Sequence, residues 1–245
     1  MPEYRVLPAG DTALVVEFGE EIDRGLSNWV LALARRLDET AIAGVVETVP
    51  TIRSLTVHYD PLALSASALT DRIVELMGGL RSGERFGRHW RIPACYDSTL
   101  APDLASVAAR TGLSPAHVVE RHSGSAYHVY MLGFLPGLAY LGDLPKELAL
   151  PRKPTPRLSV PAGSVAIATT LTCVYPVESP AGWHLIGRSP VPFFVRQPEV
   201  RTLLNPGDSV RFTPVSLREY EAILANATDG TFHLESLEER VEAAA

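Results

Sequence analysis

The chain has 245 residues, 46% of them hydrophobic, which is enough to build one large or two small domains around an apolar core. Its 22 Lys and Arg against 28 Asp and Glu leave a net charge of -6, which would repel nucleic acid and anionic lipid, so neither is an expected partner. No apolar run is long enough to cross a bilayer and no signal-peptide pattern is present, so we expect a cytoplasmic protein.

The charge is unevenly distributed along the chain. Residues 133–215 contain eight Lys and Arg against five Asp and Glu, a balance of +3, so the remainder carries -9. An anionic ligand would therefore prefer the cationic part.

The first 85 residues alternate between strand and helix patterns. Apolar, β-branched runs predict strands at Thr12–Phe18, Gly44–Val49 and Leu55–Tyr59. Apolar residues at helical spacing predict one helix behind an Asp23 N-cap and another behind a Ser67 N-cap. The order β-β-α-β-β-α predicts a small α/β N-terminal domain over residues 1–85, closed by a polar, glycine-containing linker.

The rest of the chain is rich in proline. Thirteen of the twenty prolines lie between Pro136 and Pro214, where no helix of ordinary length fits. Strands are expected at His89–Ile92, Tyr127–Met131, Ser164–Thr170, Thr172–Val177, Trp183–Gly187, Phe193–Arg196 and Ser209–Phe212. Helices are expected at Pro102–Arg110, Ser114–His122 and Ser216–Leu224. The fold class is thus α+β, with a closed or nearly closed antiparallel β-barrel over residues 86–230 and an acidic tail at 231–245.

Familiar catalytic signatures are missing from the sequence. It contains no phosphate-binding loop, no dinucleotide-binding glycine motif and no nucleophile elbow. Cys95 and Cys173 are too few for a disulfide framework or a zinc site, and the spacing of His117, His122 and His128 does not place them on one helix face. We therefore expect no bound metal.

In residues 133–142, three glycines and one proline separate aromatic and aliphatic residues. The chain must turn tightly there beside an apolar surface, so Phe134, Pro136, Gly137 and Tyr140 are candidates for lining a ligand pocket. A buried barrel loop explains the pattern equally well, with glycines supplying positive φ and aromatic rings filling the core.

The next stretch, Pro151–Arg157, contains three prolines that stiffen the backbone around Arg152 and Arg157. Rigidly held guanidinium groups suit the recognition of carboxylate or phosphate. The alternative is an exposed basic loop whose arginines pair with acids of the same chain. Ser164 follows in a turn whose N–H groups could approach an oxyanion, although a plain turn into a strand explains it as well.

The stretch Tyr175–Arg188 combines an acid, an indole, an imidazole and a guanidinium, which are Glu178, Trp183, His184 and Arg188. Strand alternation places Trp183 on one face and His184 with Arg188 on the other, so the last two could face one pocket. Alternatively, Trp183 belongs to the core and Arg188 forms a structural ion pair with Glu178.

Taken in order, these stretches resemble the family of the 5-oxoprolinase B subunit, which is also known as kinase A inhibitor KipI or allophanate hydrolase subunit 1. The family pattern runs GF-x-PGF-x-YL, PR and PR, VP-x-GSV-x-IA, YP and SPGGW-x-LIGRT. The matching residues are Gly133, Phe134, Pro136, Gly137, Tyr140, Leu141, Pro151, Arg152, Pro156, Arg157, Val160, Pro161, Gly163, Ser164, Val165, Ile167, Ala168, Tyr175, Pro176, Ser179, Pro180, Gly182, Trp183, Leu185, Ile186, Gly187 and Arg188. The sequence departs from the pattern at Leu138, Ala181, His184 and Ser189, where Phe, Gly, Gln and Thr are usual.

The resemblance implies a small α+β domain followed by a cyclophilin-like β-barrel. It also implies two partners, the A subunit of the same enzyme and a homologously barrelled C subunit. Together with this chain they would open 5-oxoproline to L-glutamate, with ATP as co-substrate. The chain would then be inactive alone.

This hypothesis gives roles to the residues singled out above. The catalytic candidates are Glu178, His184 and Arg188. The candidates for binding substrate or an anion are Arg152, Arg157, Ser164, Tyr175 and Trp183. Cationic groups among them would stabilise the charge that develops when the ring amide is activated.

Two other functions stay open. One is a KipI-like inhibitor of a sensor histidine kinase, which would use the barrel as a docking surface. The other is a carboxyltransferase component of urea carboxylase or allophanate metabolism, which would depend on biotin. Prolyl isomerase activity is the weakest hypothesis, because similarity of fold alone does not carry function.

Overall fold

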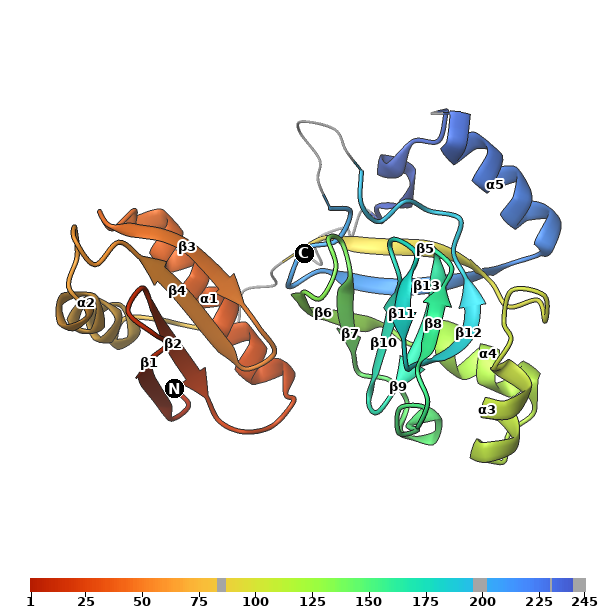
Figure 1. Ribbon diagram of the computed structural model, residues 1–245, viewed down its shortest axis with the longest axis horizontal. Helices are drawn as coiled ribbons and strands as arrows, with labels where there is room; N and C mark the ends of the chain where they lie inside the picture. The colour runs from red at the N-terminus through yellow and green to blue at the C-terminus, as the bar shows by residue number, and fades with distance from the viewer. Residues whose placement is uncertain (83–86, 196–201, 230, 240–245) are drawn as a thin grey trace, which may run out of the picture. The chain divides into compact units, whose positions relative to one another are not determined.

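The computed structural model describes residues 1–82, 87–195, 202–229 and 231–239. The chain divides into two compact units, Met1–Phe86 and Gly87–Ala245. We call them the N-terminal unit and the barrel unit and describe each by itself (Figure 1). None of the helices in these described ranges is long and apolar enough to span a membrane.

The N-terminal unit is an antiparallel sheet packed against two helices. Its described strands are ordered β1-β2-β4-β3. The elements are β1 Tyr4–Pro8, β2 Ala13–Phe18, α1 Arg24–Thr40, β3 Val45–Pro50, β4 Ser54–Tyr59 and α2 Ala66–Gly78. Alternate residues of β2 and β4 are buried and meet the apolar stripes of both helices in one cluster. The core thus forms from apolar residues that recur with the strand period in the sheet and with the helical period in the two helices.

The helix starts in this unit depend on side-chain caps. Asp23 accepts a hydrogen bond from the Leu26 N–H at 2.9 Å and caps α1, as predicted. The prediction for α2 was wrong by two residues, because Ser65 and not Ser67 accepts from the Ala68 N–H. Ser65 has the extended backbone that an N-cap needs, whereas Ser67 already lies in the first turn.

In the barrel unit, seven of the described strands close in the order β10-β7-β6-β13-β5-β12-β9, and β11 pairs with β8 in a separate small sheet. The strands are β5 His89–Cys95, β6 Tyr127–Leu132, β7 Ala139–Gly142, β8 Arg157–Val160, β9 Ser164–Ala168, β10 Leu171–Val174, β11 Ser179–Ala181, β12 His184–Arg188 and β13 Ser209–Val215. The predicted α+β class and barrel are confirmed. All neighbouring barrel strands are antiparallel except β13 and β5, which run parallel.

In the described part of this unit, three α-helices accompany the barrel: α3 Leu104–Thr111, α4 Pro115–Ser123 and α5 Leu217–Asp229. The N-cap of α4 is Ser114 and its first residue is Pro115, as predicted. Residues 231–239, which the sequence assigns to an acidic tail, lie against the barrel: Leu237 is part of its core and Glu238 forms a bridge with Trp90. Residues 240–245 of that tail lie outside the described residues.

Some strands differ from the predicted ones. The strand expected at Phe193–Arg196 is reduced to an isolated bridge between Phe194 and Thr202, and Arg196 lies outside the described residues. The predicted order β-β-α-β-β-α includes a strand before Thr12–Phe18 but gives it no residues, and the sequence does not predict β7, β8 or β11. These strands are three to five residues long and lie next to Pro or Gly, so no run of alternating residues marks them.

His122, near the end of α4, is fully buried where this helix packs against the barrel. Its Nδ1 lies 2.8 Å from the Tyr96 hydroxyl and its Nε2 lies 2.9 Å from Thr172 Oγ1. The ring also stacks on Phe212, with centroids 4.7 Å apart. Burial lowers the pKa of His122 to about 3, so the ring is neutral in the folded protein at pH 7.

Lowering the pH should therefore destabilise the barrel unit already at pH values well above 3. The folded pKa of His122 lies below the unfolded value of about 6.5, so its stabilisation is complete above pH 6.5 and is lost as the pH falls toward 3. We expect a loss of about 2 kcal/mol in unfolding free energy between pH 7 and pH 5, measured by urea denaturation. His122→Gln should flatten this slope, whereas His117→Gln, at an exposed position, should retain it; equal slopes in both variants would contradict the assignment.

Candidate active site

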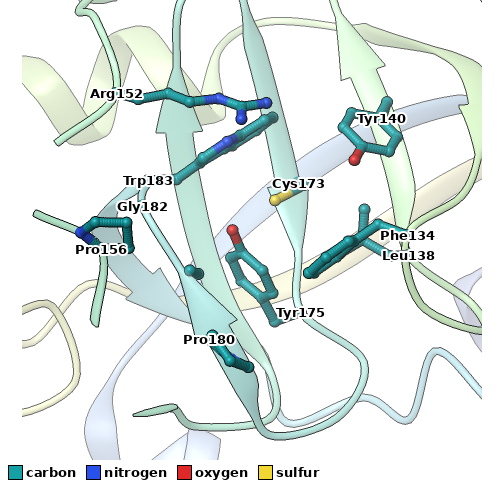
Figure 2. Close-up of a pocket in the computed structure, with 11 residues that line it drawn as sticks. Phe134, Leu138, Tyr140, Arg152, Pro156, Cys173, Tyr175, Pro180, Gly182 and Trp183 are labelled. Carbon is teal, nitrogen blue, oxygen red and sulfur yellow. The ribbon is translucent and has the colours of Figure 1, made fainter. Parts of the chain in front are cut away.

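A cavity of about 230 Å³ opens on the barrel unit (Figure 2). Its walls come from β7 with the loop before it, from the proline-rich loop 151–156, from β10, and from β11 with the two residues after it. The lining residues are Phe134, Leu138, Tyr140, Arg152, Pro156, Cys173, Tyr175, Pro180, Ala181, Gly182 and Trp183.

The loop before β7 turns tightly because of its glycine and proline residues. Gly137 has a φ of +79°, and a Cβ there would lie 2.8 Å from the Phe193 carbonyl oxygen, so only glycine fits without displacement. Phe134 also has a positive φ, +66°, and stays 68% exposed at the mouth of the cavity. The turn thus presents an aromatic ring to the cavity, and the buried Leu138 also lines it.

Two hydroxyls and one thiol lie within the cavity and all stay protonated at neutral pH. Burial is the main cause that raises the pKa of Tyr140, Tyr175 and Cys173 above their usual values. In Figure 2 the hydroxyls of Tyr140 and Tyr175 both point toward the middle of the cavity. These groups are neutral hydrogen-bond donors and not nucleophiles.

Arg152 brings a positive charge to the cavity. Its guanidinium carbon lies 5.8 Å from the Trp183 ring centroid, in a cation–π contact, and Trp183 in turn meets Tyr140 edge-on at 6.0 Å. Among the described residues, Arg152 forms no ion pair with a carboxylate, and it is the one lining residue with a formal charge. The cavity is therefore suited to a small anion with an apolar body.

The loop that carries Arg152 is held in place by Asp103, a buried carboxylate at the start of α3. Asp103 accepts hydrogen bonds from both terminal nitrogens of Arg157 at 2.7 and 2.8 Å, from Lys153 Nζ at 3.0 Å and from the Leu185 N–H at 2.8 Å. Burial alone would raise the pKa of Asp103, but these hydrogen bonds outweigh it and bring the pKa to about 2. The Lys153 N–H also donates to the Gly182 carbonyl oxygen.

The structure brings five of the sequence-predicted site residues together in the cavity. They are Phe134, Tyr140, Arg152, Tyr175 and Trp183. The seven others, which do not line it, are Pro136, Gly137, Arg157, Ser164, Glu178, His184 and Arg188. Of these, Gly137 shapes the turn before β7 and Arg157 anchors the proline-rich loop through Asp103.

His184 and Arg188 lie on β12, which has a bulge between Leu185 and Gly187. The expected simple alternation along this strand is therefore broken. The Nε2 of His184 lies 2.9 Å from the Pro151 carbonyl oxygen, and Arg188 donates to the Ala162 carbonyl oxygen at 2.8 Å. The two side chains thus contact different loops.

The two remaining candidates also have local partners. Glu178 accepts a hydrogen bond from the Ser159 hydroxyl at 2.7 Å. The alternative interpretation, an ion pair between Glu178 and Arg188, is therefore wrong. Ser164 is buried and donates to the Pro161 carbonyl oxygen at 2.7 Å. Its role there is that of a turn residue.

Several lining residues escaped prediction from sequence. Cys173 looks like a packing residue in the sequence, and its residue type gives no sign of a site. Leu138 and Ala181 are two of the four departures from the family pattern, and both line the cavity. Departures from a family pattern are therefore a sequence signal for residues that shape a ligand cavity. No group of three or more His, Cys, Asp or Glu that could hold a metal occurs within the described residues.

Similarity to known proteins agrees with the barrel fold and with the sequence motifs. Residues 4–204 match the family model described as the carboxyltransferase domain, subdomain C and D. The chain is 39% identical over 233 residues to the 5-oxoprolinase B subunit of Bacillus subtilis (strain 168), covering 89% of this chain and 96% of that relative. It is 42% identical over 217 residues to the 5-oxoprolinase B subunit of Escherichia coli O157:H7, covering 87% and 97%. The chain therefore belongs to the family of 5-oxoprolinase B subunits, as its motifs predicted.

Two solved structures share the fold. The crystal structure of TTHA0988 is 38% identical with a TM-score of 0.75, and the match covers 83% of this chain but only 40% of that longer one. The urea amidolyase of K. lactis has a TM-score of 0.76 at 20% identity, covering 94% of this chain and 16% of that one. At that identity the second match shows the fold alone.

Removing the Asp103 charge should loosen the proline-rich loop. We expect Asp103→Asn to lower the unfolding free energy by about 2 kcal/mol at pH 7, because Lys153 and Arg157 lose a buried partner but can still reach solvent. The folded pKa lies below the unfolded value of about 3.9, so the stabilisation is present above that value and is lost as the pH falls through about 2. Urea denaturation between pH 7 and pH 2 measures both effects.

The matched control is Glu120→Gln, which removes an exposed carboxylate from the same unit. It should change stability by less than about 0.5 kcal/mol. If the two variants were equally stable, Asp103 would not be the anchor of the loop.

Proposed function

We propose that this chain is the B subunit of an ATP-dependent 5-oxoprolinase, which opens 5-oxoproline to L-glutamate together with the A and C subunits. The observation that carries the proposal is the similarity along nearly the whole chain to curated 5-oxoprolinase B subunits. The cavity supports it, because a cationic group beside apolar walls suits a small cyclic acid.

The chemistry explains why ATP is needed. A ring amide is a poor electrophile, and phosphorylation of its oxygen by ATP makes the ring carbon a better one. Water can then add to that carbon, the ring C–N bond breaks as the nitrogen takes up a proton, and a second water releases phosphate from the resulting acyl phosphate to give glutamate. Negative charge develops on oxygen in that process, and nearby cations and hydrogen-bond donors stabilise it. Arg152, Tyr140 and Tyr175 are donors of this kind.

The cavity, as the described residues line it, does not supply the remaining groups. The described lining residues include no carboxylate and no imidazole that could move a proton. The sequence has no phosphate-binding loop for a nucleotide. We therefore assign proton transfer and ATP binding to the partner subunits.

Exposed apolar side chains near the cavity support a surface for such a partner. Phe134 is 68% exposed at its mouth. Leu158 is 92% exposed on β8, beside the β11 strand that carries the lining residue Pro180, and Val177 just before β11 is 39% exposed. We call these three residues the apolar rim and propose that it is covered by the C subunit. In TTHA0988 the same fold is part of a longer chain, which is consistent with a barrel that works together with further protein.

A second candidate is a carboxyltransferase component of a urea-converting enzyme. The chain is 26% identical over 269 residues to the urea amidolyase of Lachancea kluyveri, covering 94% of this chain and 14% of that one. Dependence of activity on a biotin carrier distinguishes it. The kinase-inhibitor hypothesis stays a prediction, tested by whether the chain lowers autophosphorylation of a sensor kinase.

Activity should appear only on assembly. We expect no ATP hydrolysis dependent on 5-oxoproline from the purified chain, and clear hydrolysis with glutamate release when it is mixed with the A and C subunits. A coupled assay for ADP and an amino-acid assay for glutamate measure the two products. Turnover by this chain alone, or an assembled complex that ignores 5-oxoproline, would rule the proposal out.

Charge placed on the apolar rim should prevent assembly. We expect Leu158→Asp to reduce recovery of the C subunit in co-purification about 10-fold or more, because an apolar anchor is replaced by a charge that must be desolvated. The fold should be unaffected, since Leu158 is already exposed. Leu62→Asp is the matched control, because Leu62 is 97% exposed in the N-terminal unit. Equal recovery of the partner with both variants would place the interface elsewhere.

A further inference from the structure

We infer that the cavity of this chain holds the small acid and not the nucleotide, with the carboxylate of a cyclic monocarboxylate bound by Arg152. Under the proposed function, on which this inference rests, that acid is 5-oxoproline. The subunits of the enzyme then divide the two substrates between them.

The size of the cavity limits what it can hold. Its volume of about 230 Å³ is below the roughly 300–1,000 Å³ that drug-sized ligands occupy. A single ring with one carboxylate fits within it. A nucleoside triphosphate, which has a base, a sugar and three phosphates, does not.

Charge leads to the same conclusion. Among the described lining residues Arg152 is the one cation, and no carboxylate opposes it. One guanidinium matches one carboxylate through two parallel hydrogen bonds. A triphosphate carries several negative charges, which one arginine in a largely apolar cavity cannot neutralise.

Arg152 is held ready for such a ligand. The Trp183 ring supports its guanidinium group, and flanking prolines stiffen the loop that carries it. The next residue, Lys153, ties that loop to Asp103 through its side chain and to Gly182 through its N–H. Little conformational freedom is then lost on binding.

Neutral donors complete the recognition of the ring. The hydroxyls of Tyr140 and Tyr175 point toward the middle of the cavity, and their raised pKa values keep both protonated (Figure 2). They can donate to a ring carbonyl oxygen. Trp183, Leu138 and Phe134 supply the apolar walls.

Isothermal titration of the full chain with three probes tests the inference. We expect 5-oxoproline to bind, and 2-pyrrolidinone, the same ring without the carboxylate, to bind about 10- to 100-fold more weakly because the charge-assisted pair is missing. ATP with magnesium should not compete with 5-oxoproline. Binding of 2-pyrrolidinone as tightly as 5-oxoproline, or displacement of 5-oxoproline by ATP, would overturn the inference.

Variants assign the contacts. Arg152→Gln should weaken 5-oxoproline about 10- to 100-fold but leave the weak affinity for 2-pyrrolidinone unchanged. Tyr140→Phe should weaken both ligands by a similar factor, since both contain the ring carbonyl. Arg218→Gln, at an exposed position of α5, is the matched control and should bind like the parent chain. An Arg152→Gln chain that binds 5-oxoproline normally contradicts the assignment.

The assembled enzyme separates this inference from the proposed function. If the complex is active, Arg152→Gln should raise the KM for 5-oxoproline about 10-fold or more and leave the KM for ATP unchanged. An active complex with an unchanged KM for 5-oxoproline refutes the inference and keeps the function. A chain that binds 5-oxoproline through Arg152 but forms no active complex refutes the function and keeps the inference.

Discussion

The buried carboxylate of Asp103 is the interaction on which the candidate site depends. It accepts hydrogen bonds from two cationic side chains of the proline-rich loop and from the backbone of β12, and its own N–H donates to the Leu185 carbonyl oxygen. A buried charge normally destabilises a fold, and it is tolerated here because its oxygens are satisfied by opposite charges and an N–H. Three segments distant in sequence are thereby joined. Arg152 does not touch Asp103, yet its position in the cavity follows from that junction.

The regular parts of the fold could be predicted because their signals are local. The helices α1 and α4 have apolar stripes behind recognisable caps, and strands such as β2 and β9 are mostly apolar, mostly buried runs that include β-branched residues. Strands β7, β8 and β11 could not be predicted in the same way. They are three or four residues long, and they exist because closure of the barrel and pairing with a neighbour satisfy their backbone groups. The parallel pairing of β5 with β13 joins segments more than a hundred residues apart, which no local pattern encodes.

The candidate site was predictable only in part for the same reason. Arg152 and Arg157 look equivalent in sequence, since each follows a proline in one stiff loop. The structure separates them: Arg157 turns toward Asp103, 54 residues earlier, while Arg152 lies over Trp183. The identity of a long-range partner decides which arginine can meet a ligand. Likewise, strand alternation would place His184 and Arg188 together, but the bulge in β12 directs them to different loops.

The character of the cavity favours binding over reaction. Its polar groups are two phenols and a thiol that burial keeps protonated, together with one guanidinium that stays charged at any physiological pH. None of these is poised to exchange a proton near pH 7, as a general acid or base must be. Such groups can hold a small acid in a fixed orientation and can stabilise charge that develops on its oxygen. Under the proposed function, activation of that oxygen and the movement of protons are assigned to groups of a partner protein, which would reach the ligand across the apolar rim. A cavity of this kind suits a barrel that forms one part of a shared active site, in which the barrel binds the small acid and a partner supplies the groups that move protons.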